Sequence, residues 1–283
     1  MTTVSTVKTI LITGASSGFG VAASLYFAKA GWNVIATMRT PEQAPAGLAD
    51  AGQVLVTRLD VQDSASIDAA IAAGIARFGK IDVVVNNAGY GLFGVFEGLT
   101  RAAIQKQFDT NLFGVMDVTR AILPHFRSQR AGTIINVSSG AGAIGFPMAS
   151  LYCASKFALE GYSESLSHEL ASLGIKVKIV EPGGAMQTSF MARVGTESAD
   201  SAAIADYTPF LEHVGALYAG LGAAADADAV DTVVASIYQA ATDGTKQLRY
   251  TPTRDIAALL DARRSSSEHD YRALTTGLFS LPE

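Results

Sequence analysis

The chain of 283 residues carries a formal net charge of −5 and a single cysteine, Cys153. The acidic balance argues against a nucleic-acid-binding protein, which typically has a basic surface. One cysteine excludes an internal disulfide and is typical of a reducing compartment. Charged residues make up 17% of the chain, below the usual ~25%, so a large part of it is expected to be buried. The four histidines show no ligand spacing, so no metal site is expected.

The chain is expected to form one cytoplasmic domain over residues 1–283. No apolar run approaches the ~20 residues that cross a bilayer, so no membrane span is expected. The first residues, MTTVSTVK, lack the charged and apolar regions of a secretory signal.

Residues 7–13 form a short apolar run that predicts a buried strand. Gly14, Gly18 and Gly20 follow, and a helical pattern then continues to Ala30. Glycines between a strand and a helix let the backbone approach a pyrophosphate, whose charge the helix N-terminus favours. Taken alone, the same glycines are equally compatible with a simple tight turn.

The second predicted strand, 33–38, is followed by Arg39 and has no carboxylate at its end. In dinucleotide-binding folds an acid at this point binds the ribose 2′-OH, whereas an arginine accommodates a 2′-phosphate. The sequence therefore favours NADP(H) over NAD(H). The alternative is a solvated surface arginine.

Further apolar runs alternate with helical patterns joined by short punctuated connections. This alternation predicts an α/β fold with a single doubly wound, Rossmann-type parallel sheet and helices on both faces. Ligands of such sheets lie beyond the carboxyl ends of the strands. The remaining strands are expected at 54–59, 81–85, 133–137, 176–180 and 247–251. The remaining helices are expected at 64–78, 100–130 and 228–241, and the helix that carries Tyr152 and Lys156 is expected to end at about residue 173.

The helix at 100–130 carries Asn111 among apolar neighbours and is expected to be interrupted and kinked at Pro124. A buried asparagine must find hydrogen-bond partners, so Asn111 is either functional or a polar residue at a helix seam.

Two segments depart from the regular alternation. Residues 185–222 are apolar and contain Arg193 as their only Lys or Arg, which predicts a substrate loop or lid, although ordinary helical packing would also explain some of them. The tail at about 254–283 is expected to be a short helix followed by a polar, mobile end.

Tyr152 and Lys156 are four positions apart on a predicted helix and therefore share one face. A phenol ordinarily loses its proton near pH ~10, and a nearby lysine charge is expected to bring that pKa towards the range of a general base. Ser138 and Ser139 close the preceding strand and can supply a hydroxyl to the same place. This set suits proton transfer to an alcohol or carbonyl oxygen.

Taken in order, these motifs resemble the short-chain dehydrogenase/reductase family over roughly residues 7–251. They are Thr13-Gly14-x3-Gly18-x-Gly20, Asn86-Asn87-Ala88-Gly89, Asn111, Ser139, Tyr152-x3-Lys156 and Pro182-Gly183. The stretch from Tyr152 to Gly161 is most similar to members that include 17β-hydroxysteroid and retinol dehydrogenases.

The resemblance implies a role for each catalytic residue. Tyr152 would be the general acid/base, and Lys156 would lower its pKa and hold the nicotinamide ribose. Ser139, rather than Ser138, has the family spacing to the tyrosine and would anchor the substrate oxygen. Asn111 would hold a water that links Lys156 to solvent.

The resemblance also implies a cofactor site, with Arg39 at the 2′-phosphate. Phe19 departs from the usual small aliphatic residue, and Thr188 comes later after Pro182-Gly183 than the family threonine. The implied cofactor residues, besides Arg39, Tyr152 and Lys156, are Gly14, Ser16, Ser17, Gly18, Phe19, Gly20, Asp60, Val61, Asn87, Ala88, Gly89, Pro182, Gly183 and Thr188.

The function expected from these features is an NADP(H)-dependent oxidoreductase. Its substrate would be a hydrophobic, uncharged alcohol, ketone or aldehyde, and the resemblance implies a homodimer or homotetramer. Two alternatives stay open, namely a cofactor-binding regulatory protein that senses redox state, and an epimerase or isomerase that retains its cofactor.

Overall fold

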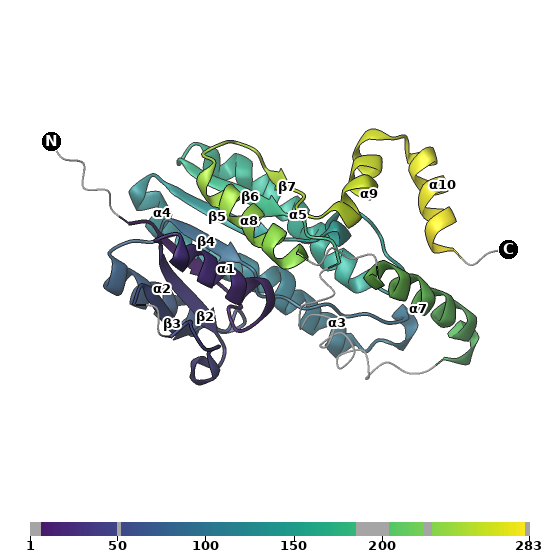
Figure 1. The fold of residues 1–283 in the computed structure, drawn as a ribbon, viewed down its shortest axis with the longest axis horizontal. Helices are drawn as coiled ribbons and strands as arrows, with labels where there is room; N and C mark the ends of the chain where they lie inside the picture. Colours follow the sequence, from purple (N-terminus) through teal and green to yellow (C-terminus); the bar gives the residue numbers. More distant parts are fainter. Residues whose placement is uncertain (1–6, 50–51, 185–203, 224–227, 281–283) are drawn as a thin grey trace.

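Figure 1 shows the fold of the computed structural model, in which residues 7–49, 52–184, 204–223 and 228–280 are described. The described chain forms a seven-stranded parallel sheet in the order β3-β2-β1-β4-β5-β6-β7, which confirms the predicted α/β fold. Its central strands read as continuous apolar runs because both faces of the sheet are covered. The strands are β1 (Thr9–Ile12), β2 (Asn33–Met38), β3 (Val54–Arg58), β4 (Val83–Asn86), β5 (Gly132–Val137), β6 (Ile175–Val180) and β7 (Arg249–Tyr250).

Helices cover both faces of this sheet, as a doubly wound fold requires. On one face α1 (Gly18–Lys29) packs beside α8 (Ala229–Thr242), with the rings of Phe27 and Tyr238 5.2 Å apart. The other face is covered by α2 (Ser64–Phe78), α4 (Gly114–Gln129) and α5 (Ser150–Ala171).

The helical segment at 101–129 differs from the prediction at one point. It consists of α3 (Arg101–Phe108), a π-helical turn at Asp109–Phe113 and α4, which continues through Pro124. The expected interruption at Pro124 is therefore wrong. The irregularity lies at the π-helical turn instead, and such turns frequently occur at functional sites. This turn holds Asn111, which is 1% exposed.

The chain after β7 also corrects the prediction, because it forms two helices rather than one helix and a polar end. These are α9 (Arg254–Ser265) and α10 (Glu268–Phe279), which lie together beyond one end of the sheet in Figure 1. On α9 the buried residues Ile256 and Leu260 lie about one turn apart, and on α10 Tyr271 and Thr275 are buried one turn apart, so each helix is held by one face.

Only part of the predicted lid can be described. Residues 204–223 include α7 (Thr208–Ala223), on which Val214 is fully buried. Residues 185–203 lie outside the described part of the chain.

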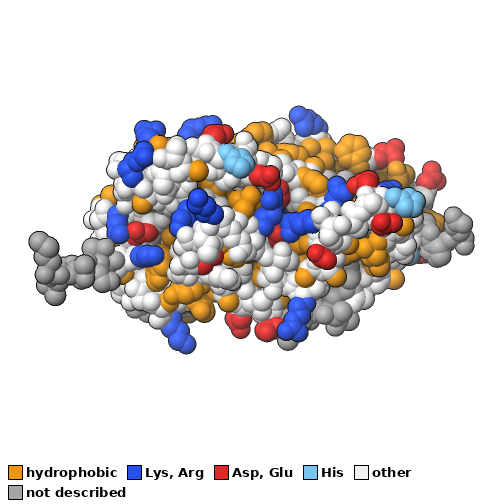
Figure 2. Space-filling view, turned by 90° about the horizontal axis from the view of Figure 1, so that it is seen from above, with side chains coloured by type: hydrophobic (Ala, Val, Ile, Leu, Met, Phe, Trp, Pro, Cys, Tyr) orange, Lys and Arg blue, Asp and Glu red, His pale blue; other side chains and the backbone are white. Residues whose placement is uncertain are grey.

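The described surface mixes charges of both signs. On the face in Figure 2, Lys and Arg are interspersed with Asp and Glu. Hydrophobic side chains are visible at several places on this face. Leu274 and Leu278 of α10 are 41% and 42% exposed. Among the described helices we find none with the length and hydropathy needed to cross a membrane.

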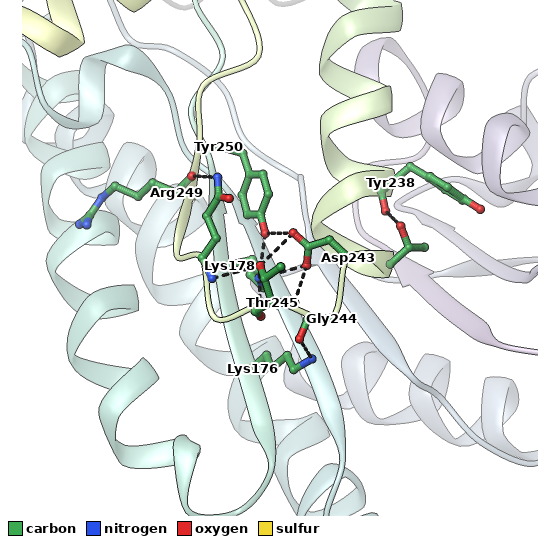
Figure 3. A network of polar contacts seen from close by, with 10 residues as sticks. Lys176, Lys178, Tyr238, Asp243, Gly244, Thr245, Arg249 and Tyr250 are labelled. Atoms are coloured by element: carbon green, nitrogen blue, oxygen red, sulfur yellow. Dashed lines mark hydrogen bonds and ion pairs between the residues drawn. The ribbon is translucent and has the colours of Figure 1, made fainter.

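The edge of the sheet at β6 and β7 is fixed by a buried lysine, as Figure 3 shows. Lys178 is 1% exposed, and its ammonium donates to the Tyr250 hydroxyl (2.7 Å) and the Thr245 carbonyl (2.9 Å). The Tyr250 hydroxyl in turn donates to Asp243 Oδ2 (2.6 Å), and Lys178 Nζ lies 3.5 Å from Asp243 Oδ1. A buried charge requires such paired and hydrogen-bonded surroundings.

This network predicts a specific acid sensitivity. Burial raises the pKa of Asp243, but hydrogen bonds from Tyr250 and Thr245 outweigh it and bring the pKa down to about 2. The folded-state pKa is depressed, so the carboxylate stabilises the fold fully above about pH 4 and loses this effect as the pH falls towards 2. Asp243→Asn should therefore lower the free energy of unfolding near neutral pH and flatten its fall in acid, as measured by urea unfolding across this range.

Asp261→Asn on α9 is a matched control, because the Asp261 side chain makes no hydrogen bond or ion pair within the described residues. An Asp243→Asn profile parallel to that of the wild type would contradict the assignment.

Candidate active site

Two loops meet where the strand order reverses, between β1 and β4. The Thr13 hydroxyl accepts hydrogen bonds from the backbone N–H groups of Asn87 and Ala88, both at 3.0 Å. The Asn87 amide donates to the Thr13 carbonyl at 2.9 Å. The carboxyl-end loops of β1 and β4 are thus joined at the point where open α/β sheets bind ligands.

The glycines of the first loop are required by its geometry. Gly14 and Gly18 have φ values of +69° and +54°, which side-chain-bearing residues rarely adopt. A Cβ on Gly20 would lie 2.2 Å from the Gly14 carbonyl oxygen. Helix α1 then begins at Gly18 with no acidic residue in its first turn, so its N-terminal N–H groups favour an anion. This loop fits the pyrophosphate of a dinucleotide.

The first loop also contains Ser16, Ser17 and Phe19, which the sequence predicted as cofactor residues. Ser16 is exposed, and Ser17 precedes the first turn of α1 at its N-cap position. Phe19 is half-buried and packs against the core cluster between α1, α8 and the sheet. The unusual side chain at position 19 therefore adds to the core beneath the loop.

The residues predicted to hold the adenosine half follow β2, β3 and β4. Arg39 is exposed immediately after β2, where the last strand residue is the buried Met38. Asp60 accepts a hydrogen bond from the Gln62 N–H (3.1 Å), and Val61 is buried beside Gly114. The structure places these residues at the same carboxyl edge of the sheet as the loop of Asn87, Ala88 and Gly89.

Tyr152 and Lys156 lie on α5 with side chains 8% and 7% exposed. The Ser139 side chain lies near enough to the Tyr152 phenol to act on its pKa. The Lys156 ammonium donates to the Val137 carbonyl at 2.8 Å and lies 5.9 Å from the centre of the Tyr152 ring. The structure therefore brings together the three side chains that the sequence singled out for proton transfer.

The pKa values of this pair differ from the expectation. Burial raises the pKa of Tyr152 to about 12, although the hydrogen bond with Ser139 acts in the opposite direction. Burial also lowers the pKa of Lys156 to about 8, while the charge of Glu160 opposes this change. In the polypeptide itself, desolvation thus outweighs the expected effect of Lys156 on the phenol. A phenol with a pKa of about 12 is protonated at neutral pH.

Asn111 is held by the loop that follows β4. Its Nδ2 donates to the Tyr90 carbonyl (2.8 Å) and to Ser155 Oγ (3.3 Å), and its Oδ1 accepts from the Tyr90 N–H (3.1 Å). The Ser155 hydroxyl donates to the Tyr152 carbonyl at 2.8 Å. Asn111 therefore connects the π-helical turn to the helix of Tyr152, and the expected water link to Lys156 stays a prediction.

Pro182 and Gly183 follow β6 and contact the serine segment. The Pro182 carbonyl accepts hydrogen bonds from the Gly140 N–H (2.8 Å) and the Ser139 hydroxyl (3.5 Å). Ser139 Oγ also accepts from the Ala141 N–H (3.1 Å), which starts a short 3₁₀ turn. Thr188 lies outside the described residues.

Sequence reasoning missed the aromatic side chains above Tyr152. The Phe93 ring stacks on the Tyr152 ring with centroids 5.8 Å apart, and Tyr218 of α7 meets Phe93 edge-on at 6.2 Å. The Tyr218 hydroxyl donates to the Pro147 carbonyl at 2.8 Å. The only sequence signal was the position of Tyr218 in the predicted lid, since nothing distinguished Phe93 within its glycine-containing loop.

Comparison with known proteins agrees with this geometry. A family model described as short chain dehydrogenase matches residues 8–199. An uncharacterised oxidoreductase of Schizosaccharomyces pombe is 41% identical over 229 residues, which cover 81% of this chain and 93% of the relative. A 3-ketodihydrosphingosine reductase of Bacteroides thetaiotaomicron is 42% identical, covering 62% of each chain. Human retinol dehydrogenase 8 is 41% identical, covering 62% of this chain and 58% of the relative.

Solved structures show the same fold with either nicotinamide cofactor. A short-chain dehydrogenase from Streptomyces avermitilis superposes with a TM-score of 0.77 at 33% identity, covering 96% of this chain and 98% of the other. A 3-ketoacyl-(acyl-carrier-protein) reductase from Brucella melitensis, complexed with NADH, has a TM-score of 0.63 at 31% identity, covering 65% and 78%. ElxO with NADP bound has a TM-score of 0.67 at 26% identity, covering 87% and 97%.

The close contact at Gly20 leads to a stability prediction. Gly20→Ala would drive a Cβ into the Gly14 carbonyl and the Asn87 amide, so the first loop must shift. We expect a loss of about 1–3 kcal/mol in the free energy of unfolding, measured by urea unfolding.

Gly277→Ala on α10 is the control, because nothing lies within 4 Å of a Cβ there. It should stabilise the exposed helix by up to about 1 kcal/mol. Equal effects of the two substitutions would show that the first loop is not tightly packed.

Proposed function

Because the chain belongs to the short-chain dehydrogenase family, we propose that it is an NADP(H)-dependent oxidoreductase. It would interconvert a secondary alcohol and a ketone, or a primary alcohol and an aldehyde, on a hydrophobic, uncharged substrate. The observation that carries this proposal is the buried Tyr152 phenol, which lies beside Ser139 and on one helix with Lys156.

The bound nicotinamide would supply the hydride chemistry. In the direction of reduction, the Ser139 hydroxyl would hold the substrate oxygen by a hydrogen bond. Tyr152 would give its proton to that oxygen, and its pKa of about 12 keeps the proton available at neutral pH. The Lys156 charge, on the same face of α5, would stabilise the phenolate that remains. Positioned acid catalysis of this kind contributes roughly 10²–10⁴ in rate.

The preference for NADP(H) is supported by the end of β2. Arg39 is exposed there, and the two side chains that end the strand, Thr37 and Met38, carry no negative charge. A 2′-phosphate would gain a charge-assisted contact with Arg39 and meet no carboxylate at this point.

The substrate class is supported by the surroundings of Tyr152. Phe93 and Tyr218 place aromatic rings beside its phenol, and Phe146 belongs to the same apolar cluster. The described lid residues 204–223 contain no Lys or Arg. Such a surface favours an apolar carbonyl compound over an anionic one.

A homodimer or homotetramer is the proposed assembly. Phe113 in the π-helical turn and Phe157 on α5 are 47% and 42% exposed. Both lie on the helical segments that carry Asn111 and Tyr152, where a second copy would cover them. The cytoplasmic location is proposed from the single, reduced and buried Cys153.

The direct test of the proposed chemistry is Tyr152→Phe. This change removes the phenol oxygen and keeps the ring that stacks on Phe93. Turnover of a panel of hydrophobic ketones, followed by loss of NADPH absorbance, should fall at least about 10²-fold. NADPH binding, measured by fluorescence titration, should change little.

Tyr26→Phe is the matched control, because Tyr26 is an exposed tyrosine on α1. Full activity in Tyr152→Phe, or turnover limited to anionic or carrier-linked substrates, would refute the corresponding part of the proposal.

The cofactor preference is tested by Arg39→Ala. Loss of one charge-assisted contact to a 2′-phosphate should weaken NADPH binding about tenfold and leave NADH binding within about twofold. Arg127→Ala, in the last turn of α4, removes an exposed arginine elsewhere and should change neither affinity. Equal losses for NADPH and NADH in Arg39→Ala would show that Arg39 is an ordinary surface residue.

A further inference from the structure

The start of α9 contacts the backbone that follows β6. Thr253, the N-cap residue of α9, is 5% exposed, and its hydroxyl accepts a hydrogen bond from the Gly183 N–H at 2.8 Å. Asp255 Oδ2 accepts a hydrogen bond from the Gly184 N–H at 2.8 Å. Two consecutive backbone donors after Pro182 are therefore satisfied by side chains some 70 residues later in the chain.

The Asp255 carboxylate lies directly over Gly183. A Cβ built on Gly183 would be 2.2 Å from Asp255 Oδ1 and 2.4 Å from Oδ2. No side chain fits between the loop and the carboxylate, so the absence of a side chain at position 183 permits this hydrogen-bonded contact. A carboxylate that accepts from backbone N–H groups makes a stronger hydrogen bond than a neutral acceptor.

The other face of the same loop contacts Ser139. The Pro182 carbonyl accepts from the Ser139 hydroxyl and from the Gly140 N–H. Ile256, the residue after Asp255, packs so closely on Gly140 that a Cβ there would be 2.2 Å from Ile256 Cγ1. Helix α9 thus touches both segments that determine where the Ser139 hydroxyl lies.

The C-terminal end of α9 contacts the residue that directly follows β6. Arg264 donates to the Glu181 carboxylate, which is fully buried and also accepts from the Thr251 hydroxyl at 3.2 Å. Glu181 immediately precedes Pro182. Contacts at both ends therefore hold the helix against the segment 181–184.

We propose that Asp255, together with Thr253, is a positioning residue for the active site: by holding the N–H groups of Gly183 and Gly184 it fixes the Pro182 carbonyl, which accepts the Gly140 N–H, and thereby holds the Ser139 segment in place beside Tyr152. This inference rests on the proposed function of Ser139. It assigns an active-site task to helix α9, which lies beyond the residues 8–199 matched by the family model.

Three single variants test the proposal. Asp255→Ala removes the acceptor and should lower kcat for a hydrophobic ketone about tenfold, the effect of one charge-assisted hydrogen bond. It should also weaken NADPH binding about threefold, because the same loop borders the dinucleotide site. Asp255→Asn keeps an amide oxygen as acceptor and should stay within about threefold of the wild type. Asp261→Ala removes an acid from the same helix without touching the loop and should change neither quantity.

Repeating the Asp255→Ala substitution in a Ser139→Ala variant distinguishes a positioning role of Asp255 from a general effect on stability. In Ser139→Ala there is no serine hydroxyl to orient, so adding Asp255→Ala should lower kcat by less than about twofold. A residue that only stabilises the fold would give the same tenfold loss in both backgrounds. Thermal unfolding of each variant shows whether the compared proteins are folded.

The outcomes separate this inference from the proposed function. Turnover absent from the wild type itself would refute the oxidoreductase proposal, while the NADPH titration would still report whether Asp255 fixes the loop. Asp255→Ala indistinguishable from Asp261→Ala in both kcat and NADPH affinity would overturn the positioning role. An undiminished tenfold effect of Asp255→Ala in the Ser139→Ala background would overturn it as well.

Discussion

The arrangement of the candidate site depends on keeping one phenol largely out of water beside a polar partner. Burial of Tyr152 raises its pKa to about 12, and the hydrogen bond with Ser139 compensates for part of the lost hydration. A polar group in this position is stable only if its partner is itself fixed. The position of Ser139 must therefore be fixed as well, and so must that of the Pro182 carbonyl, which the Ser139 hydroxyl contacts.

The parallel sheet provides these fixed positions, because the carboxyl ends of all its strands lie at the same edge. Ser139 follows β5 and Pro182 follows β6, and these two strands are neighbours in register from Gly132–Ile175 to Val137–Val180. Two strands further along the same edge, the glycine loop after β1 is joined to the loop after β4 through Thr13 and Asn87. Strand register thus brings Ser139, Pro182 and the glycine loop to one edge of the sheet.

Sequence patterns predicted those parts of the molecule that follow from local periodicity and chain order. Buried parallel strands appear as short apolar runs, and a spacing of four on a helix brings Tyr152 and Lys156 to one face. The π-helical turn around Asn111 was missed because Pro124 is the stronger local signal, whereas the turn is tied to long-range hydrogen bonds with Tyr90 and Ser155. The pKa of Tyr152 was also misjudged, since burial is a property of the folded chain.

The C-terminal helices show the same limit most clearly. Their sequence mixes apolar and polar positions, and nothing in it indicates a contact with a loop some 70 residues away. The reason for the contact lies in the loop. The backbone N–H groups of Gly183 and Gly184 are not bonded to a neighbouring strand and need other acceptors. A segment outside the dinucleotide-binding core can therefore be required for the geometry of that core, because unsatisfied backbone groups beside an active site need an acceptor from somewhere. In this chain Thr253 and Asp255 of α9 provide it.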